Sequence, residues 1–510
     1  MNKEGIITIS NPQKGIANSS ILGNEAIIGC EIFEEPGVLK IGTSLIADSS
    51  NVNNPATVTL TGVPIADVTN YNSLGTIQRS VLTYGGQLLS STNASSVQAT
   101  NLSQGWDLAV WNTEFTVVSY AQSGVGYIGV IRHDPTSNTT QWNPAKIGSL
   151  DGTHYIKLLM GNDGYMYFTN GNNLGRITGI SYDTGTGIVT VTSTSTFGSF
   201  VLPKNTYGVT LATIGSKLYI GTQKGDSYSV RNQYGYTGLV IRDYNINEAN
   251  AESIMELNEN GFNAMIANKN QIYFSAGDDG RIYVTDGTNY QLVKRLPFTN
   301  LGSTYNPTSW VYPNAMCINQ KGNLLIGLSA NYDANTPTTT GIWEIQLSQG
   351  YPTHLPFFSR DGNLGDTANV RFGSVRVLDN NALSFGVQSG TSYELSTTSS
   401  TALWSGYKAK WRTEAFLVGN ARDKKAFEQL EFLLTKPLIT NQAIKISYRK
   451  NLNDSFTEID TFSYSTLGGV ISHFAPAEIV DAEILQFEIA LDYTSSVFGQ
   501  NVYLLRTLIY

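Results

Sequence analysis

The stretch Gly215-Ser216-Lys217-Leu218-Tyr219-Ile220-Gly221, followed by Gly238-Leu239-Val240-Ile241, decides the fold. A turn signal leads into a short strand, a glycine ends that strand, and a loop delivers a second strand of aliphatic residues. The chain contains the same pattern five more times, with the first strands at 113–118, 164–168, 270–274, 322–327 and 381–386. The pattern therefore predicts a β-hairpin that is repeated along the chain.

The repeats are evenly spaced. One apolar residue in the first strand of each copy marks the spacing: Phe115, Met166, Leu218, Ile272, Leu324 and Leu383. The steps between these residues are 51, 52, 54, 52 and 59. A regular period of about fifty residues built of hairpins is typical of a propeller blade, which cannot bury both faces alone and stacks with its neighbours around an axis. We therefore expect an all-β fold with a six- or seven-bladed β-propeller over residues 66–404.

A hairpin at 80–90 complicates the blade number, because Leu88 precedes Phe115 by only 27 residues. Either it completes a seventh blade with a strand from elsewhere in the chain, or it belongs to the N-terminal part. A borrowed strand is a common way to seal a ring and remove its free edges. We favour seven blades over six.

The residues on either side of the repeats differ from them in composition and in strand pattern. Residues 1–65 are rich in Asn and Ser and hold too few apolar side chains for a core of their own. We expect an N-terminal arm or small sheet that leans on the rest of the chain or on a neighbouring subunit. We further predict that it is ordered only against such a neighbour, so that its deletion leaves a folded monomer. Residues 405–510 contain six or seven alternating strands and predict a C-terminal β-sandwich.

The composition limits the function classes. The 510 residues include 49 Gly and 28 Tyr but only 14% charged residues, and the net charge is −8. This negative net charge argues against nucleic-acid binding by the surface as a whole, although it is compatible with a local basic patch. Cys30 and Cys317 are too few for a disulfide framework and are expected to be buried free thiols. The first ten residues lack a signal-peptide core and no run is long enough to span a membrane, so we expect synthesis in the cytoplasm.

Motifs that carry chemistry are weak. Gly124-Val125-Gly126-Tyr127-Ile128-Gly129 matches a dinucleotide fingerprint by letter, but that site needs a helix N-terminus next, whereas Val130 and Ile131 continue a strand. The histidines are scattered singly, at His133, His154, His354 and His473, without metal-ligand spacing. No Gly-x-Ser-x-Gly elbow is present. A glycine-rich blade hairpin is the better interpretation of residues 124–129.

Carboxylates and tyrosines are the remaining candidates. Two stretches, Ala276-Gly277-Asp278-Asp279-Gly280 and Ser359-Arg360-Asp361-Gly362-Asn363, faintly resemble the aspartate turns of sialidase blades. We interpret them as Asx turns at hairpin ends, with a calcium loop as the alternative. The tyrosines at one blade position, Tyr167, Tyr219 and Tyr273, suit either a sugar platform or packing between blades, and we favour packing. We therefore expect no catalytic residue, no cofactor, no metal site and no enzymatic activity.

The layout as a whole resembles virion structural proteins of tailed bacteriophages. The resemblance rests on Lys14–Ala17 and Glu35–Leu39 before the blades, and on Trp411–Glu414, Ile444–Arg449 and Phe487–Ile489 after them. It implies a tail-associated component (nozzle, tip or baseplate) that is located in the virion and bound to copies of itself and to other virion proteins. A second hypothesis, based on the Tyr, Trp and Asn content, is a protein that binds or hydrolyses host surface glycans. An intracellular propeller adaptor is a third, disfavoured by the low charge and the absence of a Trp-Asp pair in each blade.

Overall fold

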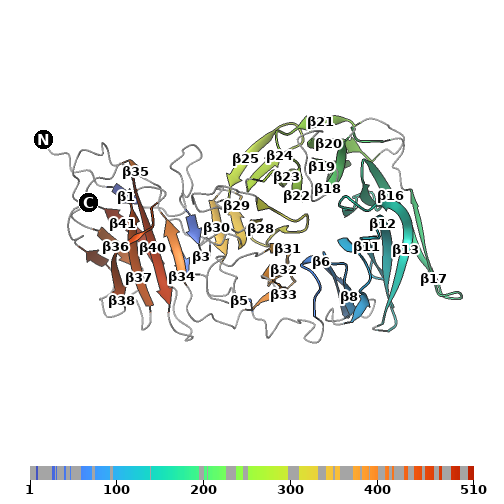
Figure 1. Cartoon of the computed structure of the whole chain (residues 1–510), viewed down its shortest axis with the longest axis horizontal. Helices are drawn as coiled ribbons and strands as arrows, with labels where there is room; N and C mark the ends of the chain where they lie inside the picture. Colours follow the sequence, from blue (N-terminus) through green and yellow to red (C-terminus); the bar gives the residue numbers. More distant parts are fainter. Residues whose placement is uncertain are drawn as a thin grey trace.

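The computed structural model describes residues 59–71, 75–91, 96–137, 139–194, 200–203, 205–225, 237–244, 251–278, 280–296, 309–330, 341–347, 371–379, 382–389, 391–399, 442–450 and 454–463, together with the backbone of individual strands elsewhere. Every regular element among them is a β-strand. Figure 1 shows most of these strands arranged as a ring of sheets, with a separate group of sheets at one end of the molecule. The predicted all-β class is confirmed.

Seven four-stranded units form the blades of a β-propeller. The first four blades are β6–β9 (Pro64–Tyr71, Ile77–Thr83, Leu88–Ser91, Val97–Ala99), β10–β13 (Gln104–Val110, Phe115–Gln122, Val125–His133, Thr140–Asp151), β14–β17 (Leu158–Met160, Met166–Asn170, Asn173–Asp183, Ile188–Thr194) and β18–β21 (Thr206–Ile214, Lys217–Lys224, Gly238–Asp243, Ser253–Glu256). The last three are β22–β25 (Phe262–Asn268, Gln271–Ala276, Arg281–Thr285, Tyr290–Arg295), β27–β30 (Met316–Ile318, Leu324–Ala330, Gly341–Gln346, Tyr351–Leu355) and β31–β33 (Arg371–Val377, Leu383–Ser389, Ser392–Ser399), which β5 (Ile46–Ala47) completes. A short strand, β26 (Ser309–Trp310), also pairs with β28. The preference for seven blades over six is thereby confirmed.

The period of the sequence has a simple structural origin. Each of the six marker residues lies in the second strand of its blade, and each is buried. Leu88 departs from the spacing of about fifty residues because it lies in the third strand of the first blade, β8, and not in the second. The hairpin at 80–90 is the β7–β8 pair, with Val81 opposite Leu89, and it belongs to a complete blade of its own. The blade of this hairpin therefore takes no strand from elsewhere, and it is the last blade, β31–β33, that a borrowed strand, β5, completes.

Apolar side chains fill the spaces between neighbouring blades. Tyr167, Tyr219 and Tyr273 are buried, which confirms packing and rules out a role for these three as exposed sugar platforms. Close packing also explains Gly175 in β16. A Cβ atom at Gly175 would lie 2.0 Å from Cζ of Phe168, a ring that is completely buried. The absent side chain thus leaves room for an aromatic ring on the neighbouring strand β15.

Strands from the N-terminal residues pair with distant parts of the same chain. The strand β5 pairs with β33, so the last blade has its fourth strand from residues 46–47. The strand β2 (Ala26–Ile28) lies parallel to β30 of the sixth blade and antiparallel to β34 (Lys408–Arg412). Of the two partners expected for this segment, the structure provides the rest of the chain. Without β5, the strand β33 would be left as an open edge of the propeller.

The strands after the propeller belong to two sheets. One sheet has the order β3-β4-β41-β36-β39, with β1 (Ile7–Ile9) also paired to β41 (Tyr503–Ile509). Its other members are β3 (Cys30–Glu31), β4 (Leu39–Ile41), β36 (Leu430–Leu434) and β39 (Val470–His473). The second sheet continues from β2 through β34, β40 (Ile484–Tyr493), β37 (Gln442–Arg449) and β38 (Thr457–Ser463), with β35 (Phe416–Leu417) on β40. Two antiparallel sheets are what a C-terminal sandwich requires. The proposed bounds 1–65, 66–404 and 405–510 stay predictions, since residues 400–407 lie outside the described residues.

Candidate functional site

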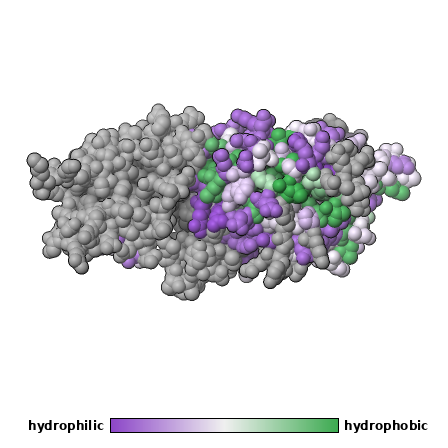
Figure 2. Space-filling model, turned by 90° about the horizontal axis from the view of Figure 1, so that it is seen from above, coloured by the Kyte–Doolittle hydropathy of each residue, from purple (hydrophilic) through white to green (hydrophobic). Residues whose placement is uncertain are grey.

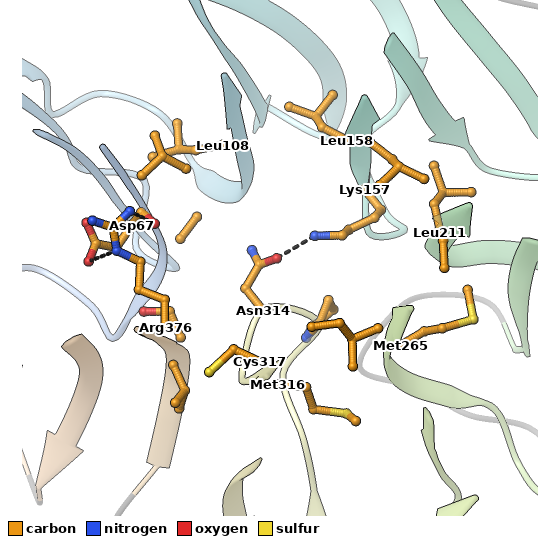
Figure 3. A pocket seen from close by; sticks show the side chains of 18 of the residues that line it. Asp67, Leu108, Lys157, Leu158, Leu211, Met265, Asn314, Met316, Cys317 and Arg376 are labelled. Carbon is orange, nitrogen blue, oxygen red and sulfur yellow. Dashed lines mark hydrogen bonds and ion pairs between the residues drawn. The ribbon is translucent and has the colours of Figure 1, made fainter. Parts of the chain in front are cut away.

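The inner strands of the propeller enclose a cavity of about 410 Å³ on the ring axis. All seven blades contribute to its lining, through β6, β10, β14, β18, β22, β27 and β31 or the residues beside them. Figure 3 shows Leu158, Leu211 and Met265 on one side of this cavity and Asp67 and Arg376 on the other. Asn314 and Lys157 point toward each other between these two sides. The cavity therefore combines an apolar wall with a charged one.

Asn314 connects several blades from a loop that precedes β27. Its Nδ2 atom donates to Oδ1 of Asp107 at 2.7 Å and to the carbonyl oxygen of Ile65 at 3.0 Å. Its Oδ1 atom accepts a hydrogen bond from Nζ of Lys157, which also lies 2.9 Å from Oδ2 of Asp107. Its main-chain carbonyl accepts from the amide of Val375 at 2.9 Å. One side chain and its backbone thus bind the first, second, third and seventh blades to the sixth.

Asp107 is held from more than one direction. In addition to Asn314 and Lys157, its carboxylate accepts from the amide nitrogens of Leu108 and Leu158, both at 2.9 Å. The Asp107 side chain is 1% exposed and that of Lys157 is 12% exposed. Each of its two carboxylate oxygens therefore has two donors, so the hydrogen-bonding capacity of this buried group is filled. Asp107 and Lys157 thus form an ion pair that joins the second blade to the third.

A second charged cluster lies between the first and seventh blades. Asp67 accepts two hydrogen bonds from Arg79, at 2.9 Å from Nε and 2.7 Å from Nη2, and a third from Ser384 at 2.7 Å. Nε of Arg376 lies 3.1 Å from the same carboxylate. Burial alone would raise the pKa of Asp67, but the charges of Arg79 and Arg376 and the hydrogen bonds lower it from 3.8 to about 2. Asp67 is thus an anion that joins the first blade to the last.

Among the described residues, Cys317 is a candidate sulfur nucleophile beside these groups. It lines the cavity and is a free thiol, as the sequence predicted. Burial raises the pKa of the Cys317 thiol to about 12. A thiol that stays protonated at neutral pH is a poor nucleophile. The side chain of Cys30 lies outside the described residues, so its assignment as a buried free thiol stays a prediction.

The histidines are not brought together. His133, in β12, is buried against the hydroxyl group of Thr116, with 2.9 Å between Nε2 and Oγ1, and burial lowers its pKa to about 4. His154 lies 2.7 Å from Oδ2 of Asp151 and stacks on Tyr207 with 3.6 Å between ring centroids. The side chains of His354 and His473 lie outside the described residues. His133 and His154 therefore have separate structural surroundings.

The other sequence candidates are hairpin residues. Residues 124–129 lie in the β11–β12 hairpin, with Gly126 opposite Ala121, which confirms the blade interpretation over the dinucleotide one. Asp278 accepts a hydrogen bond from Asn260 at 3.2 Å, at the turn between β23 and β24. Asp279 and Asp361 lie outside the described residues. Asx turns do occur at hairpin ends, for example where Asp286 accepts from the amide of Thr288 at 2.9 Å.

Within the described part of the chain, no three His, Cys, Asp or Glu side chains are grouped in a way that could hold a metal ion. The same residues contain no helix that is long and apolar enough to cross a membrane. Sequence reasoning missed the axial residues Asp67, Asp107, Lys157 and Asn314. They carry no motif, and their only shared signal is their position in or just before an inner strand.

No family model matches the chain, and no curated protein matches it. Among solved structures it is similar to the WD40 repeats of RRP9, with 9% identity and a TM-score of 0.43 over 70% of this chain and 99% of that one. It is similar to U3-55K at 8% identity and a TM-score of 0.41, over 67% and 97% of the two chains. An exo-β-1,3-galactanase from Phanerochaete chrysosporium gives 8% identity and a TM-score of 0.26, over 80% and 95%. These likenesses are too distant to bear on activity, and the seven-bladed fold rests on the strand pairing itself.

Proposed function

We propose that this chain is a non-enzymatic structural component of a tailed-bacteriophage virion, associated with the tail at its nozzle, tip or baseplate. The observation that supports a scaffold role is the use of charge at the propeller axis. Asp67 is bound by Arg79 and Arg376, and Asp107 by Lys157 and Asn314. An active site keeps some polar groups free for its substrate, whereas these groups bind one blade to another.

The pairing of the N-terminal strands supports the same role. The strand β2 connects the edge of the sixth blade to the C-terminal sheets, and β5 completes the seventh blade. A ring whose seam is fastened in this way is suited to a rigid part in a larger assembly. The viral context comes from the resemblance in layout described above. In this proposal the protein is made in the host cytoplasm and binds copies of itself and other virion proteins.

Quantitative mass spectrometry of purified particles tests the proposal. We expect the chain in several copies per particle, in a constant ratio to the major capsid and tail proteins of the same particles. Lysate proteins of similar abundance serve as the control for carry-over, because they are lost during density-gradient purification. A chain that is lost with them is not a virion component.

The alternative is a protein that binds or hydrolyses host surface glycans, and the axial cavity is the observation that favours it. A volume of about 410 Å³ falls within the usual range of small-ligand sites. Sugar release from host polysaccharide separates hydrolysis from binding, and a glycan array tests binding alone. If the intact chain neither binds nor releases sugar, the alternative is excluded.

A further inference from the structure

The outer edge of the third blade is uncovered. The strand β17 pairs with β16 on one side and is the last strand of its sheet, and no other described strand pairs with its free edge. Its sequence is Ile-Val-Thr-Val-Thr-Ser-Thr, in which every residue except Ser193 is β-branched. It contains no charged residue and no proline. Such an edge is a ready template for another strand, because its outward N–H and C=O groups are unpaired.

The outer strands of the other blades are protected. The strands β9 and β21 are only three and four residues long. In β13 the ladder is interrupted by register shifts near Pro144 and by positive φ angles at Ala145 (51°) and Ser149 (59°). The strand β25 ends in Lys294 and Arg295. These are the devices that natural sheets use against edge-to-edge pairing.

The last two blades are protected by coverage. The strand β2 lies along β30 of the sixth blade, and β5 covers β33 of the seventh. The strand β17 has seven residues, no charged residue, no proline and no positive φ angle, and the one register shift in its ladder, between Ile177 and Gly179, lies on β16. Within the described propeller it is therefore the exception, and its edge is the one that the chain leaves open to a partner.

The position and faces of β17 suit a partner strand. In Figures 1 and 2 the β16–β17 hairpin projects furthest from the ring, at the right of both views, and Figure 2 shows hydrophobic atoms on it. Thr190, Thr192 and Thr194 are exposed, and Ile188 is 54% exposed. The opposite face carries Val189, which packs with Phe115 and Val130 of the second blade. The hairpin is thus anchored through one face while its edge stays accessible.

We propose that β17 pairs antiparallel with β17 of a second copy of this chain. Centred on Val191, this pairing places Thr190 opposite Thr192 of the second copy and Ile188 opposite its Thr194. Threonine pairs across antiparallel strands are favourable, and the register brings no charge against another. The alternation of threonine on one face and valine on the other makes the strand complementary to itself. A two-fold dimer then joins two third blades into one eight-stranded sheet.

Sedimentation equilibrium of the full-length chain tests the dimer. We expect a reversible monomer–dimer equilibrium in the native chain. The variant Thr190→Lys with Thr192→Lys places lysines opposite lysines and is expected to raise the dissociation constant about tenfold or more, a loss of roughly 1.4 kcal/mol. The variant Thr190→Glu with Thr192→Glu, measured by itself, is expected to raise the dissociation constant by a similar factor. An equimolar mixture of the two restores the dimer as a heterodimer.

The control adds two lysines elsewhere. Ser253→Lys in β21 with Gln291→Lys in β25 changes net charge equally at two exposed positions, and leaves the equilibrium unchanged. Circular dichroism checks that all variants fold. A native chain that is monomeric at every soluble concentration overturns the proposal, as does a dimer that the β17 variants do not weaken. The measurement uses the purified chain alone, so its outcome is independent of the virion proposal.

Discussion

Asn314 and Asp107 are hydrogen-bonded at 2.7 Å although one precedes the inner strand of the sixth blade and the other lies in the second. The contact crosses the ring axis instead of following its circumference. Neighbouring blades are already joined by packed side chains, but a contact across the axis fixes the radius of the whole ring. The stability of the propeller is therefore expected to depend strongly on this amide.

The variant Asn314→Ala tests this dependence. It leaves Asp107 and Lys157 without a shared partner and the carbonyl of Ile65 without its donor. Because hydrogen bonds to charged groups are lost, we expect a destabilisation of about 2–4 kcal/mol in urea unfolding. The exposed amide of Asn162, which bonds to the carbonyl of Gly215, provides the matched control. Equal costs for Asn314→Ala and Asn162→Ala would contradict the axial role.

Asp67 is expected to make the fold sensitive to acid. Its pKa is about 2 in the folded protein, against 3.8 for an unperturbed aspartate. A lowered pKa stabilises the fold fully above about pH 4, and the contribution of about 2 kcal/mol is lost as pH falls toward 2. Asp67→Asn leaves the buried guanidinium of Arg79 and the partly buried one of Arg376 uncompensated, and should cost about 3–5 kcal/mol at neutral pH.

The pH dependence separates this effect from general acid unfolding. The free energies of unfolding of the native chain and of Asp67→Asn are measured in urea from pH 6 to pH 2.5. The gap between them should narrow below about pH 4, because the Asp67 carboxylate of the unfolded native chain then takes up a proton while the folded one, with its pKa of about 2, stays ionised. A gap of constant size over this range would show that the charge of Asp67 does not contribute.

Substitution by alanine is expected to have opposite effects on stability at two glycines of β16, Gly175 and Gly179. Gly175→Ala forces a methyl group against the buried ring of Phe168, at 2.0 Å from its Cζ atom. We expect a loss of about 1–3 kcal/mol from this overpacking. Gly179→Ala meets only ordinary contact with Thr192 at 3.9 Å and is expected to be neutral or slightly stabilising. Thermal unfolding of both variants measures the difference, and similar midpoints would contradict it.

Deleting residues 1–58 is now expected to destabilise the propeller. The deletion removes β5 and leaves β33 as a free edge, and it also removes β2 from between β30 and β34. We expect a lower unfolding midpoint and faster proteolysis than in a control that lacks only residues 1–5. This outcome replaces the folded, unaltered monomer that the sequence suggested. A truncated chain with the native midpoint would restore the earlier view.

Much of the fold could be predicted because the blades repeat one local pattern. Markers such as Met166 and Leu218 lie in equivalent second strands, so their spacing reveals the period before any contact is known. The N-terminal strands could not be placed. The strands β2 and β5 have three and two residues, too few for a periodic pattern, and their partners lie hundreds of residues away.

The axial groups could not be predicted for a related reason. Asn314 reaches Asp107 over 207 residues and Ile65 over 249. Nothing in the sequence around Asn314 differs from an ordinary turn, because its role comes from the closed ring that places it on the axis. The sequence did exclude a dinucleotide-binding site at residues 124–129. Those residues match the glycine fingerprint, but they continue into a strand instead of a helix.

The pairing of β5 with β33 sets an order of events during synthesis. Ile46 and Ala47 leave the ribosome before their partners, Thr398 and Ser399, which emerge some 350 residues later. At about 5–20 residues per second, the nascent chain carries an unsatisfied strand for roughly twenty seconds or more. Ring closure must therefore be among the last steps of folding, and any product of premature termination before residue 399 is left with an open seam.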